Sequence, residues 1–207
     1  MIVLIDNSIN QTQKTYVPYI ISYLDHHKIS YTIVQGNIQG LQHLKQIAHK
    51  VQGIIMSGSP LMLPSNPKPE QYICNVYCLK TLRHIPILGI CFGCQLIHTF
   101  FGGSLYDLQR VHCRKFFTTA DSTATLPWFQ HNGQKAQFCC KYLPDTKPIK
   151  TLRTHMFVTI PSSDSPLPCV IQHKKRPILG VMFHPEAITE THWVLDYFLD
   201  LKKFPSS

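Results

Sequence analysis

The sequence predicts an α/β protein built on an open, mostly parallel, doubly wound sheet. Short apolar runs rich in β-branched residues recur along the first half of the chain, and segments with helical apolar spacing alternate with them. The apolar runs are continuous, which is typical of strands that are buried on both faces. Strand–helix alternation of this kind places helices on both sides of a parallel sheet.

The first three strands and two helices follow in order along the chain. The opening run Ile2–Ile5 predicts the first strand, and Tyr31–Val34 and Gly53–Met56 predict the next two. Helical spacing predicts helices over Tyr16–Leu24 and Leu41–Val51. Each helix therefore connects one strand to the next, as a parallel crossover requires.

A third helix is expected from about residue 70 to residue 84, before Pro86. Its apolar residues are spaced three apart and predict one buried face, formed by Ile73, Val76, Leu79 and Leu82. Ile87–Ile90 then predicts a fourth strand, which leads directly into a helical pattern from Phe92 to Phe101. Two glycines after Phe101 provide the C-terminal stop of that helix.

The second half of the chain predicts short strands followed by one last helix. We expect strands at Lys115–Thr119, Ala136–Lys141, Met156–Ile160, Cys169–Gln172 and Ile178–Phe183, and a helix from about Thr191 to Leu201. The sequence contains no repeats, low-complexity segments or internal linker. Residues 1–207 are therefore expected to form a single domain.

Composition indicates a globular protein, with 44% hydrophobic and 15% charged residues. The apolar runs are too short to cross a bilayer, which takes about 20 residues, and the opening Met1–Asp6 lacks the basic region of a signal peptide. We expect a soluble, cytoplasmic protein. The net charge is +9, but the densest basic run, His173–Arg176, is better explained as a solvated loop than as a nucleic-acid-binding arm.

The eight cysteines predict neither a disulfide framework nor a metal site. Disulfides are typical of secreted chains. A structural zinc site needs two cysteine pairs flanked by turns, whereas Cys74 and Cys78 fall in a helical pattern and Cys91 and Cys94 span a strand end. Buried thiols are the expectation for most of the eight.

The sequence Gly89-Ile-Cys-Phe-Gly93 places a cysteine between a buried strand and a helix. Small residues two before and two after Cys91 allow the sharp turn of a nucleophile elbow. Such a turn presents the thiol at the carboxyl edge of the sheet, where open α/β sheets bind their ligands. The helix N-terminus offers N–H groups to a developing oxyanion. The alternative is a buried cysteine between glycines that only permit close helix–strand packing.

His184-Pro185-Glu186 follows directly after the predicted strand Ile178–Phe183. A thiol nucleophile needs a base, and the base needs an orienting group on its other ring nitrogen. Pro185 fixes the intervening turn, so Glu186 can curl back to His184. We favour this catalytic interpretation over a plain exit from the strand.

Ser57-Gly-Ser-Pro60 ends another predicted strand, Gly53–Met56. In an open sheet this turn lies beside the elbow, where its backbone N–H groups can help to hold an oxyanion. A turn without a catalytic role is the alternative.

Together these motifs resemble those of the class I (triad) glutamine amidotransferase domains, especially the stand-alone glutaminase subunits of GMP synthetase. The resemblance rests on Gly-Ile-Cys-Phe-Gly-Cys-Gln at 89–95, with His-Pro-Glu about 90 residues later and Ser-Gly-Ser-Pro about 30 residues earlier. It implies the flavodoxin-like fold of that family, with residues 1–207 as one glutamine amidotransferase type 1 domain. It also implies hydrolysis of L-glutamine to glutamate and ammonia through a γ-glutamyl thioester.

By this resemblance Cys91 attacks the side-chain amide, His184 transfers the proton and Glu186 orients His184. The resemblance also implies a set of substrate-binding residues, namely Gly58, Ser59, Phe92, Gln95, Met156 and Phe157. Within that set, the N–H groups of Ser59 and Phe92 match the family's oxyanion hole.

Two of these positions depart from the family's pattern. Ser59 stands where the family usually has glycine, and its Cβ would penalise a positive φ. Phe157 stands where the GMP synthetase subunits have an aspartate.

The resemblance further implies a partner, because family members of this size mostly supply ammonia to a synthetase. The chain contains no G-x-x-x-x-G-K-[ST] phosphate loop, so we expect no cofactor in it. ATP and Mg²⁺ are expected on an ATP-dependent synthetase subunit, for which the ATP-pyrophosphatase of GMP synthetase, aminating XMP, is favoured. We expect no membrane or nucleic-acid partner.

Three alternatives stay open. The chain can be the glutaminase component of an anthranilate or aminodeoxychorismate synthase, because Ile5-Asp-Asn7 resembles the opening motif of that group. It can be a stand-alone thiol hydrolase of γ-glutamyl compounds. It can also be an inert amidotransferase-like module that only binds glutamine or another protein.

Overall fold

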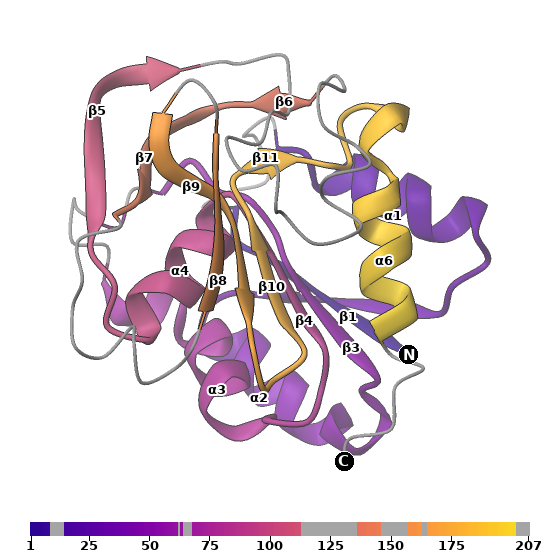
Figure 1. Ribbon diagram of the computed structural model, residues 1–207. Helices are drawn as coiled ribbons and strands as arrows, with labels where there is room; N and C mark the ends of the chain where they lie inside the picture. Colours follow the sequence, from indigo (N-terminus) through magenta and orange to yellow (C-terminus); the bar gives the residue numbers. More distant parts are fainter. Residues whose placement is uncertain are drawn as a thin grey trace.

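A seven-stranded sheet forms the centre of the protein in the computed structural model (Figure 1). The structure describes residues 1–8, 15–61, 63, 68–112, 136–145, 157–162 and 165–201. The strand order is β2-β1-β3-β4-β10-β9-β8. The first five strands in this order run parallel, and β9 and β8 continue the sheet in antiparallel fashion. The predicted fold class is therefore confirmed.

The strands of this sheet lie close to the positions that the apolar runs predict. They are β1 (Ile2–Asp6), β2 (Tyr31–Gln35), β3 (Gly53–Met56), β4 (Ile87–Ile90), β8 (Phe157–Ser162), β9 (Ser165–His173) and β10 (Ile178–Val181). Every residue of β3, β4 and β10 is buried. Burial on both faces explains why their sequences are continuously apolar.

Helices cover both faces of the sheet (Figure 1). One layer contains α1 (Val17–His26) and α6 (Trp193–Leu201), which are joined by a hydrogen bond from the Tyr23 hydroxyl to Asp196. The other layer contains α2 (Ile38–Ile47), α3 (Ile73–Thr81) and α4 (Phe92–Phe100). Short 3₁₀ turns occur at η1 (Ala48–Lys50), η3 (Pro69–Gln71) and η5 (Thr189–Thr191).

The buried face of α3 differs from the prediction. Its fully buried residues are Cys74, Asn75, Cys78 and Leu79, whereas Ile73, Val76 and Leu82 are only partly buried. An α-helix turns about 100° per residue, so positions spaced strictly three apart drift back by about 60° at each step. Four such positions cannot share one face, and the i, i+1, i+4, i+5 set packs instead.

Two small sheets lie above the carboxyl edge of the central sheet (Figure 1). One pairs β5 (Leu105–His112) with β7 (Cys140–Pro144), and the other pairs β6 (Gln137–Phe138) with β11 (Phe183–His184). The predicted strand 136–141 is thus two strands separated at Cys139. No pattern in the sequence indicated β5, and the predicted strand 115–119 lies outside the described residues.

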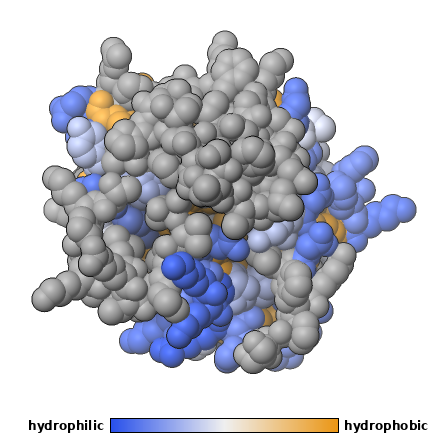
Figure 2. Space-filling view, in the orientation of Figure 1, coloured by the Kyte–Doolittle hydropathy of each residue, from blue (hydrophilic) through white to orange (hydrophobic). Residues whose placement is uncertain are grey.

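The basic run His173–Arg176 agrees only in part with the expectation of a solvated loop. Figure 2 shows hydrophilic side chains gathered at the lower edge of the displayed face, where Figure 1 places the turn between β9 and β10. Lys174 and Lys175 in that turn are exposed, whereas His173 is buried and Arg176 is partly buried, so the expectation of a solvated loop holds only for the two lysines. Among the described residues, none of the helices has the length and apolarity needed to cross a membrane.

Candidate active site

Cys91 lies at the junction between β4 and α4 in a strained backbone conformation. Its φ is 49° and its ψ is −100°, a region that residues with a Cβ rarely adopt and that costs about 1–3 kcal/mol. Its N–H donates to Val181 O at 2.8 Å, which ties the turn to β10. This is the geometry of a nucleophile elbow, with the side chain at the carboxyl edge of the sheet.

Two glycines make this tight turn possible. A Cβ on Gly89 would lie 2.6 Å from the carbonyl of Gly93, and a Cβ on Gly93 would lie 2.5 Å from Met56 O. Both positions therefore need glycine for close contact between α4 and the strands. The sequence motif allowed two interpretations, close helix–strand packing and a nucleophile elbow. Both features are present in the structure.

His184 and Glu186 form a buried pair just beyond β10. His184 Nδ1 lies 3.0 Å from Glu186 Oε1, and their exposed fractions are 4% and 2%. Glu186 Oε2 has no hydrogen-bond partner in the described structure, so His184 is the group that compensates the carboxylate. A carboxylate on Nδ1 leaves Nε2 of the imidazole available to face a nucleophile.

The surroundings of His184 favour its protonated form. Burial by itself lowers the pKa of the imidazole, but the charge of Glu186 and hydrogen bonds with Cys91 and Glu186 outweigh it. Together they raise the pKa of His184 from its ordinary value near 6.5 to about 10. At neutral pH the ring therefore carries a proton that it can deliver to a leaving group.

The turn after β3 closes the site from the other side. A Cβ on Gly58 would lie 2.8 Å from His184 Cε1 and 3.6 Å from Cys91 Cβ. The backbone of this turn is thus in direct reach of both reactive side chains. As the sequence predicts, the turn and the elbow are neighbours at the carboxyl edge.

Ser59 does not strain this turn. Within the described part, the residues other than glycine with a positive φ are Lys28, Cys91 and Gln109, so the penalty expected for a Cβ at Ser59 does not arise. Instead its hydroxyl donates to Asn7 O at 2.6 Å and accepts from the N–H of Leu61 at 3.0 Å. The serine side chain therefore fixes the turn that glycine would leave flexible.

A buried polar network holds the same turn against the strand ends. Asn7, which follows β1, donates to Ser57 O through its side chain and to Ser57 Oγ through its N–H, both at 3.0 Å. Asn75 of α3 donates to Asn7 Oδ1 at 2.8 Å. Because the members are buried and hydrogen-bonded to one another, they specify one arrangement of the loops.

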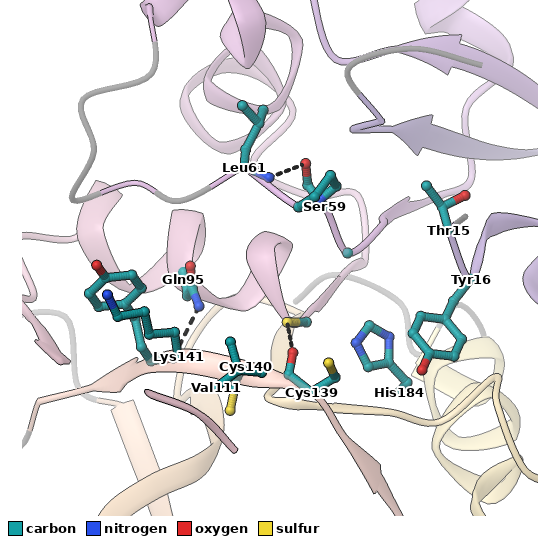
Figure 3. Close-up of a pocket in the computed structure, with 14 residues that line it drawn as sticks. Thr15, Tyr16, Ser59, Leu61, Gln95, Val111, Cys139, Cys140, Lys141 and His184 are labelled. Carbon is teal, nitrogen blue, oxygen red and sulfur yellow. Dashed lines mark hydrogen bonds between the residues drawn. The ribbon is translucent and has the colours of Figure 1, made fainter. Parts of the chain in front are cut away.

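A cavity of about 250 Å³ opens between these elements (Figure 3). Its lining includes Gly58, Ser59, Cys91, Gln95 and His184. The volume is slightly below the roughly 300–1,000 Å³ typical of small-molecule sites, so it suits a small metabolite. The cavity brings together five of the residues that the sequence singles out.

The remaining predicted residues differ in how they relate to the cavity. Gln95 lines it, and its side-chain amide donates to Tyr142 O at 3.0 Å. Phe92 has a buried side chain and is the first residue of α4, where helical N–H groups lack an acceptor within the helix. Phe157 begins β8, with its side chain outside the described part, and Met156 lies outside the described residues.

Sequence reasoning missed several residues that line the cavity, and Tyr16 and Cys139 are the two that contact the proposed catalytic side chains. The Tyr16 ring stacks on the His184 ring, with centroids 4.0 Å apart (Figure 3). Cys139 accepts a hydrogen bond from Cys91 Sγ through its backbone O at 3.7 Å, the dashed contact beside it in Figure 3. Neither residue belongs to a local motif, so no signal in the sequence pointed to it.

The arrangement suits covalent chemistry at a carbonyl-type centre. A thiol, an imidazole and an orienting carboxylate meet beside the N-terminus of α4, and this set is typical of acyl transfer through a thioester. Within the described part of the chain, no group of three or more His, Cys, Asp or Glu residues is placed to hold a metal ion.

Comparison with known proteins gives relatives in several synthase systems. The chain is 29% identical over 160 residues to a glutamine-hydrolysing GMP synthase subunit of Pyrococcus furiosus, covering 70% of this chain and 71% of that one. It is 31% identical over 134 residues to anthranilate synthase component 2 of Methanocaldococcus jannaschii, covering 62% of each. It is 25% identical over 170 residues to GMP synthase of Prochlorococcus marinus, covering 76% of this chain and only 28% of that longer protein.

A solved structure has the same fold. A protein assigned to the GMP synthase subunits, from Thermoplasma acidophilum, matches with a TM-score of 0.72 at 20% identity, over 98% of this chain and 93% of that one. The family model for class-I glutamine amidotransferases matches residues 4–200. The chain therefore belongs to the class-I glutamine amidotransferase family.

Proposed function

We propose that this chain hydrolyses glutamine to glutamate and ammonia and passes the ammonia to a synthetase, with Cys91, His184 and Glu186 as the catalytic residues. The observation that carries the proposal is the convergence on one small cavity of a strained cysteine at a helix N-terminus and a buried His184–Glu186 pair. Membership of the class-I glutamine amidotransferase family supports it.

In the first half-reaction Cys91 Sγ, having given its proton to His184, attacks the side-chain amide carbon of glutamine. The carbonyl oxygen becomes an oxyanion, which the N–H groups of Ser59, in the turn after β3, and of Phe92, at the start of α4, can hold. His184 then protonates the departing nitrogen, so ammonia leaves and a γ-glutamyl thioester remains on Cys91.

In the second half-reaction water attacks the thioester and His184 accepts its proton. The carbon–sulfur bond breaks, glutamate is released and Cys91 regains its starting form. Glu186 acts throughout on His184 Nδ1, because it keeps the ring oriented and compensates its charge.

We propose GMP synthetase as the system that uses the ammonia, with ATP and Mg²⁺ bound by an ATP-pyrophosphatase partner rather than by this chain. The relatives assigned to GMP synthase support this, since one is a separate subunit of comparable length. The anthranilate synthase component at 31% identity favours a second candidate, in which the partner uses chorismate.

The experiment measures glutamate release from glutamine by the wild type and Cys91→Ala. Cys74→Ala is the matched control, because Cys74 is buried in α3 and does not line the cavity. We expect release by the wild type and the control but not by Cys91→Ala. Release that survives Cys91→Ala would contradict the proposed nucleophile, and binding of glutamine without release would favour an inert module.

The partner is tested by adding an ATP-pyrophosphatase subunit with XMP and ATP, or a chorismate-using subunit with chorismate. Acceleration by the first supports the GMP assignment. Acceleration by the second transfers the chain to the chorismate pathway. Release that ignores both partners favours a stand-alone hydrolase.

A further inference from the structure

Sulfur groups gather around the nucleophile in a way that glutamine hydrolysis does not require. Cys139 and Cys140 line the same cavity as Cys91 (Figure 3). They come from a different part of the fold, at the break between β6 and β7. The described cysteines are all thiols, with no disulfide among them.

The contact between Cys91 and Cys139 is direct. Cys91 Sγ lies 3.7 Å from the carbonyl oxygen of Cys139. The exposed Cys139 is therefore in contact with the reactive sulfur through its backbone. A disulfide needs the two Cα atoms about 4.4–6.8 Å apart, a separation that residues in direct contact can reach.

Cys139 also lies between two strands rather than inside one. It stands between β6, which pairs with β11, and β7, which pairs with β5, and it belongs to neither ladder. By contrast Cys140 pairs with His112 in the β5–β7 ladder and is buried in the core. A shift that joins two sulfurs is therefore easier at Cys139 than at Cys140.

Other cysteines near the elbow are poor candidates for reaction. Cys94 is fully buried, and burial followed by the neighbouring Cys91, Cys169 and Cys140 raises the pKa of its thiol. Cys169 is buried in β9. Since the thiolate is the reactive form, exposure and position favour Cys139 as the resolving thiol.

We propose that Cys91 and Cys139 are a peroxide-sensitive pair, which forms a reversible disulfide that switches the enzyme off and protects the nucleophile. The proposal rests on the proposed function, because the reactivity of Cys91 follows from its pairing with His184. The oxidant is hydrogen peroxide.

The chemistry takes two steps. The Cys91 thiolate attacks one oxygen of the peroxide, the O–O bond breaks, and the sulfur becomes a sulfenic acid while hydroxide leaves and is protonated to water. The Cys139 thiolate then attacks the Cys91 sulfur, the S–S bond forms and the S–O bond breaks. The hydroxide released takes the proton that Cys139 gave up, so two thiols and one peroxide give one disulfide and two waters.

The test treats the full chain with hydrogen peroxide, blocks remaining thiols by alkylation and identifies cross-linked peptides by mass spectrometry. We expect a peptide that joins Cys91 to Cys139, and recovery of glutaminase activity with dithiothreitol. In Cys139→Ser the cross-link disappears, Cys91 proceeds to the sulfinic acid, and recoverable activity falls by about five-fold or more. Cys74→Ala, which removes a buried thiol of α3 that does not line the cavity, is the control and keeps the behaviour of the wild type.

Three results would overturn the pair: no cross-link in the wild type, a cross-link to a cysteine other than Cys139, or equal recovery in Cys139→Ser and the wild type. The mass measurement needs no glutamine, so it is independent of the proposed function. If the wild type forms no cross-link but its glutaminase activity depends on Cys91, only this inference is overturned. If glutaminase activity survives in Cys91→Ala, the proposed function is overturned, and the mass measurement alone decides whether the pair forms.

Discussion

The two edges of the parallel strands each carry a cavity with charged side chains, but they differ in how those charges are satisfied. At the carboxyl edge the cavity is about 250 Å³ and contains Cys91, in a strained conformation, and the buried His184. At the amino edge a larger cavity, about 390 Å³, is lined by residues that include Arg83, His173 and Arg176. Volume therefore does not identify the reactive site.

The polar groups at the amino edge close the ends of secondary structure. The Arg176 guanidinium donates to Leu79 O at 2.9 Å and to Arg83 O at 3.4 Å, which caps the C-terminal end of α3. His173 Nδ1 accepts from the N–H groups of Lys175 and Arg176, both at 3.0 Å. Burial, and then the charge of Arg83, lower the pKa of Arg176.

The carboxyl edge, in contrast, contains groups that are strained or lack a hydrogen-bond partner. These are the backbone of Cys91 in a strained conformation, a carboxylate oxygen of Glu186 without a partner among the described residues, and the imidazole of His184, whose pKa is raised to about 10. Strain and coupled titrating groups mark sites where structure is maintained for chemistry. Substitutions at this edge should change activity more than stability, and substitutions at the amino edge should do the reverse.

The largest expected effect is that of Cys91→Ala. Without the thiol no thioester forms, so we expect glutamine hydrolysis to fall by more than about 10³-fold. Alanine keeps the Cβ and therefore the backbone strain, so thermal melting should change little. Measuring kcat and the melting temperature together checks this, and a large stabilisation would show that the sulfur, rather than the backbone, is the source of strain.

Gly58→Ala is next in size. The new Cβ would lie 2.8 Å from His184 Cε1, and the ring is held between Glu186 and Tyr16. Displacing it should lower kcat/KM by about 10²-fold, the cost of misplacing a catalytic group by about 1 Å. Steady-state kinetics measure the effect, and unchanged kinetics would mean that the ring can move aside without loss.

Glu186→Gln should lower kcat by about 10- to 100-fold, because the base loses its orienting charge. It should also change how stability depends on pH. In the wild type the folded-state pKa of His184 is about 10, above its unfolded value near 6.5. The stability linked to His184 is therefore complete below about pH 6.5 and is lost as pH rises through about 10.

In the glutamine variant the charge of Glu186 no longer opposes the effect of burial, so the pKa of His184 is lower than in the wild type. The difference in the free energy of unfolding between wild type and variant should thus be largest near pH 6 and shrink towards pH 10. Urea unfolding across this range measures it. A difference that is constant with pH would contradict the charge coupling between His184 and Glu186.

Arg176→Met probes the amino edge. Loss of the helix-capping hydrogen bonds should lower the free energy of unfolding by about 1 kcal/mol, while glutamine hydrolysis stays unchanged. Lys174→Met in the same turn is the control, because its side chain is exposed and should cost almost nothing. A fall in activity without loss of stability would place Arg176 in function instead.

Substitutions of Ser59 should also have small effects. Ser59→Ala removes the hydrogen bonds to Asn7 O and from the Leu61 N–H, which predicts a loss of about 1 kcal/mol and a few-fold fall in activity. Because the φ of Ser59 is not positive, Ser59→Gly should bring no gain in activity. A gain in kcat for the glycine variant would show that the serine restrains the turn during catalysis.

The sequence predicted most reliably the parts whose pattern follows from local burial. The strands Ile2–Asp6, Gly53–Met56 and Ile87–Ile90 were found because burial on both faces demands continuous apolar runs. The edge strand β5 was missed because part of it is exposed, as at Tyr106 and Val111, and it has no such run.

The candidate site divides in the same way. The elbow at Cys91 and the turn to Glu186 were predictable, because each depends on residues within a few positions and on glycine or proline at fixed offsets. The stacking of Tyr16 on His184 and the contact of Cys139 with Cys91 join residues 168 and 48 positions apart. No local pattern encodes such contacts.

The sequence by itself therefore determined the parallel strands of the central sheet, the family, and the residues that we propose as nucleophile and base. Only the tertiary structure decided that Ser59 fits its turn without strain, that α3 buries Asn75 rather than Val76, and which distant cysteine contacts Cys91. The physical reason is the separation along the chain over which each kind of interaction acts. Hydrophobic periodicity and turn geometry act over a few residues, whereas side-chain packing and hydrogen bonding between loops depend on how distant segments meet at the edge of the sheet.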